Sequence, residues 1–115
     1  MEKLTDKTLE ALIRLPGEEA AIEIPVAMLR LGRYLGELIT ERALLTAERK
    51  TFRACEYIGM LSIDPKAPEW KLRARVEHLE TFSANLQRVA QLDGMIETGQ
   101  IQFAALLARS KTNDH

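Results

Sequence analysis

The sequence predicts an all-α protein, built as a hairpin of two long helices with short N- and C-terminal helices and completed by oligomerisation. Apolar residues recur at three- and four-residue steps along two long segments, which is typical of amphipathic helices. No segment alternates apolar and polar residues as a half-buried strand would. The length of 115 residues is enough for a single helical domain, residues 1–115, with one modest core.

A short first helix is expected over residues 4–15, with Thr5 or Asp6 as its N-cap. Pro16 ends this helix because proline has no amide hydrogen to donate. Residues 18–24 could form one helical turn or be extended, since the residue before Pro25 is disfavoured in the helical region.

Pro25 fits the first turn of a long helix, where a missing amide hydrogen costs nothing, and this helix is expected over residues 25–57. Its apolar stripe consists mainly of leucines at helical spacing, close to a heptad repeat. A helix of this length spans about 50 Å, at ~1.5 Å per residue. Such a helix is too long to be covered by its own small chain, so we expect a helix from another copy to cover it.

The loop after this helix contains Asp64-Pro65 and Ala67-Pro68, and a second long helix is expected over about residues 69–97. Gly99 is a natural break before a short C-terminal helix over about 101–109, which is apolar nearly all round and must be buried. The leucine stripe and this final helix exceed what one hairpin can cover. The predicted oligomer interface therefore consists of Leu31, Leu35, Leu38, Leu45, Leu106 and Leu107.

The bulk composition excludes several classes of protein. Sixteen basic and seventeen acidic residues give a net charge of −1, so the whole-chain charge does not favour nucleic-acid binding. No apolar run approaches the ~18 residues of a membrane span, and the charged N-terminus is unlike a secretory signal, so we expect a cytoplasmic protein. Cys55 is the only cysteine, which excludes an internal disulfide and a zinc site built on thiolates.

Groups that could perform catalysis are few. His78 and His115 are the only histidines, and the acidic neighbours of His78, Glu77 and Glu80, are typical of a solvated helix flank. The chain lacks a phosphate-binding glycine loop of the Walker type and the Glu-x-x-His pattern of bundle metal sites. We therefore predict no catalytic residues, no metal site and no cofactor, and expect that the protein is not an enzyme.

A cluster of basic residues marks the end of the first long helix. Arg49, Lys50 and Arg53 share one helix face, and Tyr57 follows one turn later, where an aromatic ring can stack on an unpaired base. A second set opens the next helix, and a hairpin would bring both sets to one end of the molecule. This set consists of Lys66, Trp70, Lys71 and Arg73, followed by Arg75. The pattern alone favours an ordinary solvated helix face over a surface for a polyanion.

The order of these features resembles that of the phage UvsY-like recombination mediator family. In that family an Ile-Pro pair enters a long charged helix that ends in two aromatic residues, a spacer and glycine, before a loop, a second long helix and a glycine break. This chain has Ile24-Pro25, the segment Glu56-Tyr57-Ile58-Gly59, and Thr98-Gly99 in the same order. The resemblance extends from about residue 24 to 103, and its motifs are short.

The resemblance implies a homo-oligomer of six or seven copies, without catalytic activity, that binds single-stranded DNA during phage DNA recombination and repair in the host cytoplasm. It also implies two protein partners, because such mediators help to load a RecA-like recombinase in place of single-strand-binding protein. Aligned on Gly59, Arg53 and Tyr57 match the family's second basic and second aromatic positions, whereas Thr51 and Glu56 depart from the first of each. We expect Lys50, one turn before Arg53, to take the place of the missing basic residue.

The alternative function is a helical protein-interaction module without DNA binding, such as an assembly chaperone or structural adaptor that holds an amphipathic helix of a partner.

Overall fold

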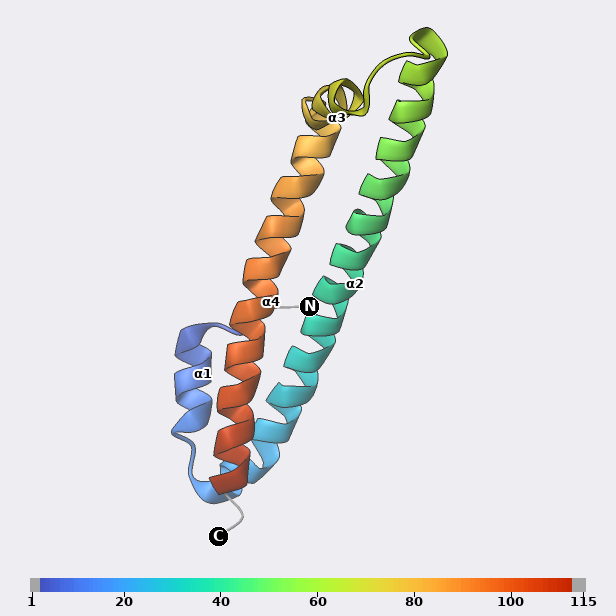
Figure 1. Ribbon diagram of the computed structural model, residues 1–115. Coiled ribbons are helices and arrows are strands. Elements are labelled where there is room, and N and C mark those ends of the chain that lie inside the picture. The colour runs from blue at the N-terminus through green and yellow to red at the C-terminus, as the bar shows by residue number, and fades with distance from the viewer. Residues whose placement is uncertain (1–2, 113–115) are drawn as a thin grey trace. The chain divides into compact units, whose positions relative to one another are not determined.

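The computed structural model describes residues 3–112, so His115 lies outside the described residues. It contains helices α1 (Asp6–Ile13), α2 (Gly17–Ile63), α3 (Glu69–Glu77) and α4 (Glu80–Thr112), as Figure 1 shows. Residues 3–112 contain no strand, which confirms the all-α class. Within the same residues, no helix is long and apolar enough to cross a membrane.

The contacts within the chain group it into two compact units. Unit 1 consists of Met1–Ile39 together with Gly94–His115, and unit 2 is the continuous segment Thr40–Asp93. Helix α1 belongs to unit 1 and α3 to unit 2, while α2 and α4 each contribute residues to both.

Helix α1 is capped as its sequence predicts. The Thr5 hydroxyl oxygen accepts a hydrogen bond from the Thr8 amide at 3.2 Å, which identifies Thr5 as the N-cap. The helix ends at Ile13, slightly earlier than expected, and Pro16 follows in the short connection to α2.

Helix α1 is anchored at both ends by polar side chains of α4. The buried amide of Gln102 donates to the Leu4 carbonyl oxygen at 2.7 Å. The Arg109 guanidinium donates to the carbonyl oxygens of Ile13 and Leu15, each at 2.8 Å. These carbonyls lie at the carboxyl end of α1, where a cation also interacts favourably with the helix dipole.

Helix α2 begins earlier than the predicted start at Pro25. The segment 18–24, for which two conformations were open, is helical and follows Gly17. Pro25 and Ala21 are both exposed, so water can reach the Ala21 carbonyl that proline deprives of its helical donor. Ile24 is 0% exposed, and full burial of such a side chain stabilises by about 1.5–3 kcal/mol. Burial therefore outweighs the local preference against helix before proline.

Helix α2 also ends later than predicted. It continues from Tyr57 through Gly59 to Ile63, and Asp64-Pro65 then ends it. Glycine inside a helix costs only about 1 kcal/mol relative to alanine, whereas proline removes a hydrogen bond and restricts the residue before it. The proline is the stronger stop signal.

The second long segment differs from the prediction at two places. A turn at His78-Leu79 separates α3 from α4, so the expected helix over 69–97 is interrupted. Val76 and Phe82 would lie about 120° apart on one straight helix, at ~100° per residue. The turn lets both side chains be buried. At Gly99, by contrast, there is no break, and the predicted C-terminal helix over 101–109 is part of α4.

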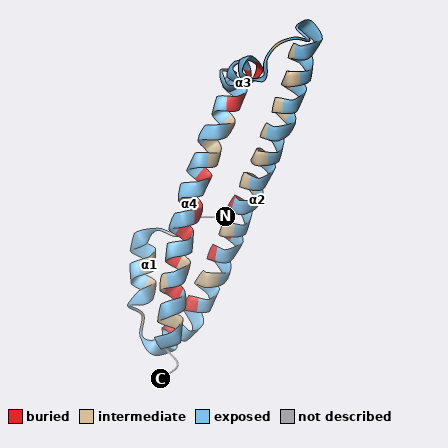
Figure 2. Ribbon diagram, in the orientation of Figure 1, coloured by how far each residue is buried: buried red, intermediate tan, exposed pale blue. Residues whose placement is uncertain are grey.

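The core of unit 1 is formed by one face of α2 and one face of α4, as the burial colours in Figure 2 show. Three residues of the predicted oligomer interface, Leu31, Leu38 and Leu106, are buried in this core. The chain itself therefore covers part of the stripe that was expected to need another copy.

Helices α2 and α4 are antiparallel within unit 2. Glu41 of α2 pairs with Arg88 of α4, and farther along α2 Arg53 contacts Phe82, which precedes Arg88. Contacts that advance along α2 while receding along α4 are those of a hairpin, as the sequence predicts.

Gly99 is a site of close helix packing. A Cβ atom placed on it would lie 2.5 Å from the Leu35 Cδ2 atom and 3.2 Å from its Cγ atom, whereas a Cβ on Gly94 would meet nothing within 4 Å. We expect Gly99→Ala to destabilise by about 1 kcal/mol, because overpacking of 1–3 kcal/mol exceeds the gain in helix propensity. Gly94→Ala should stabilise by up to about 1 kcal/mol. Urea denaturation measures both, and equal stabilisation by the two variants would contradict this packing.

Candidate nucleic-acid interface

The basic residues predicted as a site concentrate in one stretch of unit 2. Residues 49–75, called here the basic segment, contain seven basic and three acidic residues, a net charge of +4 in a chain of net −1. The segment covers the end of α2, the loop and most of α3. Its basic residues are Arg49, Lys50, Arg53, Lys66, Lys71, Arg73 and Arg75, and its acidic residues are Glu56, Asp64 and Glu69.

The structure brings together one member from each of the two predicted basic sets. The interaction of Arg73 of α3 with the Tyr57 hydroxyl of α2, followed by the nearby charge of Glu69, raises the pKa of Arg73 above its ordinary value. The Arg73 Nη2 atom also donates to the Glu69 carboxylate at 3.2 Å. Arg73 thus keeps its positive charge while it joins the two helices of the basic segment.

The lysines of the segment and its tryptophan face solvent. Lys50, Lys66 and Lys71 are exposed, and Trp70 is 72% exposed in the first turn of α3. A large aromatic side chain in solvent is unusual, and this one has lysine as its immediate neighbour. These four side chains are accessible to a ligand without any rearrangement.

Arg53 is directed toward α4 instead of solvent. Its guanidinium carbon lies 5.3 Å from the centre of the Phe82 ring, a cation–π distance, and Phe82 is only 3% exposed. The Arg53 Nε atom is buried without a hydrogen-bond partner. Arg53 therefore contributes its charge from a partly buried position, which the sequence pattern did not predict.

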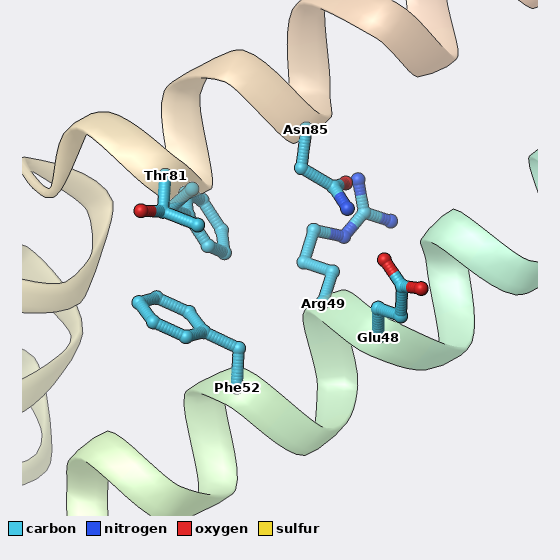
Figure 3. A pocket seen from close by; sticks show the side chains of 6 residues that line it. Glu48, Arg49, Phe52, Thr81 and Asn85 are labelled. Atoms are coloured by element: carbon cyan, nitrogen blue, oxygen red, sulfur yellow. The ribbon is translucent and has the colours of Figure 1, made fainter.

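Beside Arg53, α2 and α4 border a cleft of about 220 Å³. Figure 3 shows Phe52 and Arg49 extending from α2 toward Thr81 and Asn85 of α4. The cleft is lined by Glu48, Arg49, Phe52, Thr81, Phe82 and Asn85. The Asn85 Nδ2 atom donates to the Leu45 carbonyl oxygen at 2.8 Å, whereas its Oδ1 atom is buried without a partner. The cleft thus combines aromatic walls with a hydrogen-bond acceptor.

Two ion pairs join α2 and α4 in the part of unit 2 next to this cleft. The Arg88 guanidinium donates from Nε and Nη2 to the two carboxylate oxygens of Glu41, at 2.9 and 3.0 Å. The second pair, between Arg42 and Asp93, has an N–O distance of 2.9 Å. Two parallel hydrogen bonds fix both partners in the first pair, which holds the helices in register.

The Glu41–Arg88 pair predicts a pH dependence of stability. The hydrogen bond from Arg88 holds the pKa of Glu41 below its ordinary value against the opposing effect of burial, and the charge of Arg88 adds a lesser lowering. The unfolded chain therefore binds this proton more readily, so the contribution is complete above the unfolded pKa and is lost as pH falls through the folded pKa. Glu41→Gln should flatten the loss of stability at acidic pH, measured by urea denaturation. Retention of the full loss of stability at acidic pH in Glu41→Gln would contradict this role of the pair.

Groups that could bind a metal do not cluster in the part of the chain that the structure describes. Within residues 3–112, no three His, Cys, Asp or Glu side chains lie close enough together to hold a metal ion. His78 is the C-cap of α3, and Cys55 is exposed on α2.

The remaining predicted interface residues lie at intermediate or exposed positions. Leu35 and Leu45 are partly buried, and Leu107 is 40% exposed.

Sequence reasoning missed the α4 side of the cleft, Phe82 and Asn85. Their spacing of three places them on one helix face, but only the pairing of α2 with α4 shows that this face meets Arg49 and Phe52. Comparison with known proteins gives no match to a family model, a curated protein or a solved structure.

Proposed function

We propose that the protein is a homo-oligomeric recombination mediator that binds single-stranded DNA and helps to load a RecA-like recombinase in place of single-strand-binding protein. The observation that carries the DNA-binding part is the basic segment, with its net charge of +4 and the exposed Trp70. Lysines that track a phosphate backbone supply affinity through counterion release. The mediator role is carried by the resemblance in the order of sequence motifs.

Exposed aromatic rings favour single strands over duplexes. A base in a duplex has both faces covered by its neighbours, whereas an unpaired base can stack on a side chain for about 1–3 kcal/mol. Trp70 is largely exposed and available for such stacking, while Tyr57 is half-buried. Trp70 is therefore the principal stacking residue in this proposal.

A second apolar face of α2 supports self-assembly. Leu29, Gly32, Gly36 and Ile39 follow one another at three- and four-residue steps, on a face of α2 centred about 120° around the helix from Leu31, at ~100° per residue. Leu29 is 58% exposed and Ile39 42% exposed, and a Cβ on either glycine would meet nothing within 4 Å. We call these four residues the outer face. An amphipathic helix of a monomer would carry polar residues here.

The proposed occupant of the outer face is the outer face of a second copy. Glycines allow two helix backbones to approach closely, and an antiparallel copy would place Gly32 near Gly36 and Leu29 near Ile39 of its partner. Arg33 and Glu37 lie one turn apart along the same edge, so the same arrangement brings each against the opposite charge. Several copies would multiply the modest charge of each basic segment.

The DNA-binding proposal predicts salt-sensitive binding of single strands. Fluorescence anisotropy should show that a labelled single-stranded oligonucleotide binds more tightly than the duplex of the same sequence. A fourfold increase in salt concentration should weaken this binding, because released counterions drive it. Equal affinity for both forms, or binding that salt does not change, would overturn the proposal.

The alternative, a helical protein-interaction module, is favoured by the outer face alone. An assembled protein that binds neither form of DNA in the same measurement would support this alternative.

A further inference from the structure

The cleft between α2 and α4 has the features of a site for one flat, hydrogen-bonding ring. Its volume is about 220 Å³, and an apolar cavity of ~150 Å³ is already large enough to hold benzene. Phe52 of α2 and the buried Phe82 of α4, whose ring lies beside the Arg53 guanidinium, both line it, and most of the accessible lining is apolar. A ring in such a cleft gains dispersion contacts and can stack on Phe52.

Asn85 gives this cleft a directional preference. Because its Nδ2 atom donates to the Leu45 carbonyl oxygen, the side-chain amide cannot turn over without losing that hydrogen bond. The Oδ1 atom is thereby fixed as an acceptor, and it is buried without a donor. A buried acceptor without a partner is costly, so a ligand that supplies an N–H group to it is favoured.

We propose that the cleft holds one unpaired nucleobase and that Asn85 Oδ1 accepts a hydrogen bond from the amino group of that base. This inference rests on the proposed single-strand binding and adds a base preference to it. Adenine and guanine both combine a large ring for stacking with an exocyclic amino group, and adenine is the base used in the test. Phosphates on either side of the base meet Arg49, which lines the cleft, and Lys50, the next residue of α2.

A nucleobase suits the charges around the cleft better than the indole of a protein partner does. Both are flat rings with an N–H donor, but only the base is attached to phosphates. The positive charges of Arg49, Lys50 and Arg53 occur within five residues of α2, and Glu48 is the acidic residue among those that line the cleft. This excess of positive charge favours the anionic chain.

The test compares two single strands that differ by the amino group alone. Strands of about 15 nucleotides contain either deoxyadenosine or deoxynebularine, whose purine ring lacks the amino group. Anisotropy should give about 2- to 10-fold tighter binding of the adenine strand, the size of one hydrogen bond. In Asn85→Leu the ratio should fall to about one, with unchanged affinity for the nebularine strand. Phe52→Leu should weaken the binding of both strands by about fivefold or more.

The controls separate this inference from the proposed function. Circular dichroism confirms folding of each variant, and the two-strand comparison on the unmodified protein needs no variant at all. Binding of both strands with equal affinity, or an adenine preference that survives Asn85→Leu, overturns the base pocket and leaves single-strand binding intact. Failure to bind either strand overturns both proposals. Displacement of the strand by N-acetyltryptophanamide as readily as by deoxyadenosine monophosphate would assign the cleft to a protein side chain and also overturn the base pocket.

Discussion

Replacing Lys50, Lys66 and Lys71 together by alanine is expected to weaken single-strand binding by about 100-fold in 0.1 M salt. Each phosphate contact with single-stranded DNA contributes about 0.7 to the slope of log affinity against log salt, so three contacts contribute about two. Anisotropy titrations at several salt concentrations should show this flattening of the slope. All three lysines are exposed, so the fold should be unaffected.

Two matched variants define what this result means. The triple variant of Lys7, Arg14 and Arg30 removes the same charge from exposed positions of unit 1 and should leave the salt slope nearly unchanged. Trp70→Ala should weaken binding at every salt concentration without changing the slope, because stacking releases no counterions. If both triple variants lost the same affinity for single-stranded DNA, the overall charge of the protein would determine binding, and the basic segment would not be a specific binding surface.

The double variant Leu29→Gln, Ile39→Gln is expected to weaken self-association by at least about 100-fold. Both side chains are exposed within the chain, so the monomer should keep its fold. In a twofold interface each substitution occurs twice, and burial of each apolar side chain contributes about 1 kcal/mol or more. Light scattering and sedimentation across micromolar concentrations should show the shift from assembly to monomer.

Ile101→Gln is the control for this variant, because Ile101 is an exposed apolar residue of unit 1 on α4, outside the outer face. Its self-association should match that of the parent. A parent protein that is monomeric at micromolar concentration would contradict the assembly proposal directly. Dissociation by Ile101→Gln instead would place the interface on α4.

The helical class and the antiparallel pairing within unit 2 were predictable because periodicity reflects which side of a helix is buried. Helix ends were less predictable, since they depend on tertiary contacts. The burial of Ile24 favours helix in the segment before Pro25, so α2 begins earlier than predicted. At its other end, α2 continues past Gly59, which was predicted to end it. Gly99 was predicted to end a helix, but α4 is continuous there. Because glycine has no Cβ atom, the side chain of Leu35 can pack against the helix at this position.

The candidate site was predictable on α2 and α3 and hidden on α4. The basic and aromatic residues of the segment 49–75 are close in sequence, so their clustering is visible without a structure. The contact of Arg53 with Phe82 and the approach of Asn85 to Leu45 depend on helix register, which periodicity leaves undetermined. The oligomer interface was predicted from the leucines with the most regular helical spacing. Such spacing is found in the core of a single chain as well as in an interface between chains, so the sequence alone does not distinguish the two.

The anchoring of α1 by the last turns of α4 has a consequence for the order in which a nascent chain can fold. Unit 2 is continuous in sequence, so its contacts can form while synthesis is still in progress. Unit 1 must wait, because Gln102 and Arg109, which hold Leu4 and Ile13, are synthesised only after the whole of unit 2. Until then the part of unit 1 that precedes unit 2 lacks its partner residues on α4, and it is the part of the chain that chaperones would need to shield.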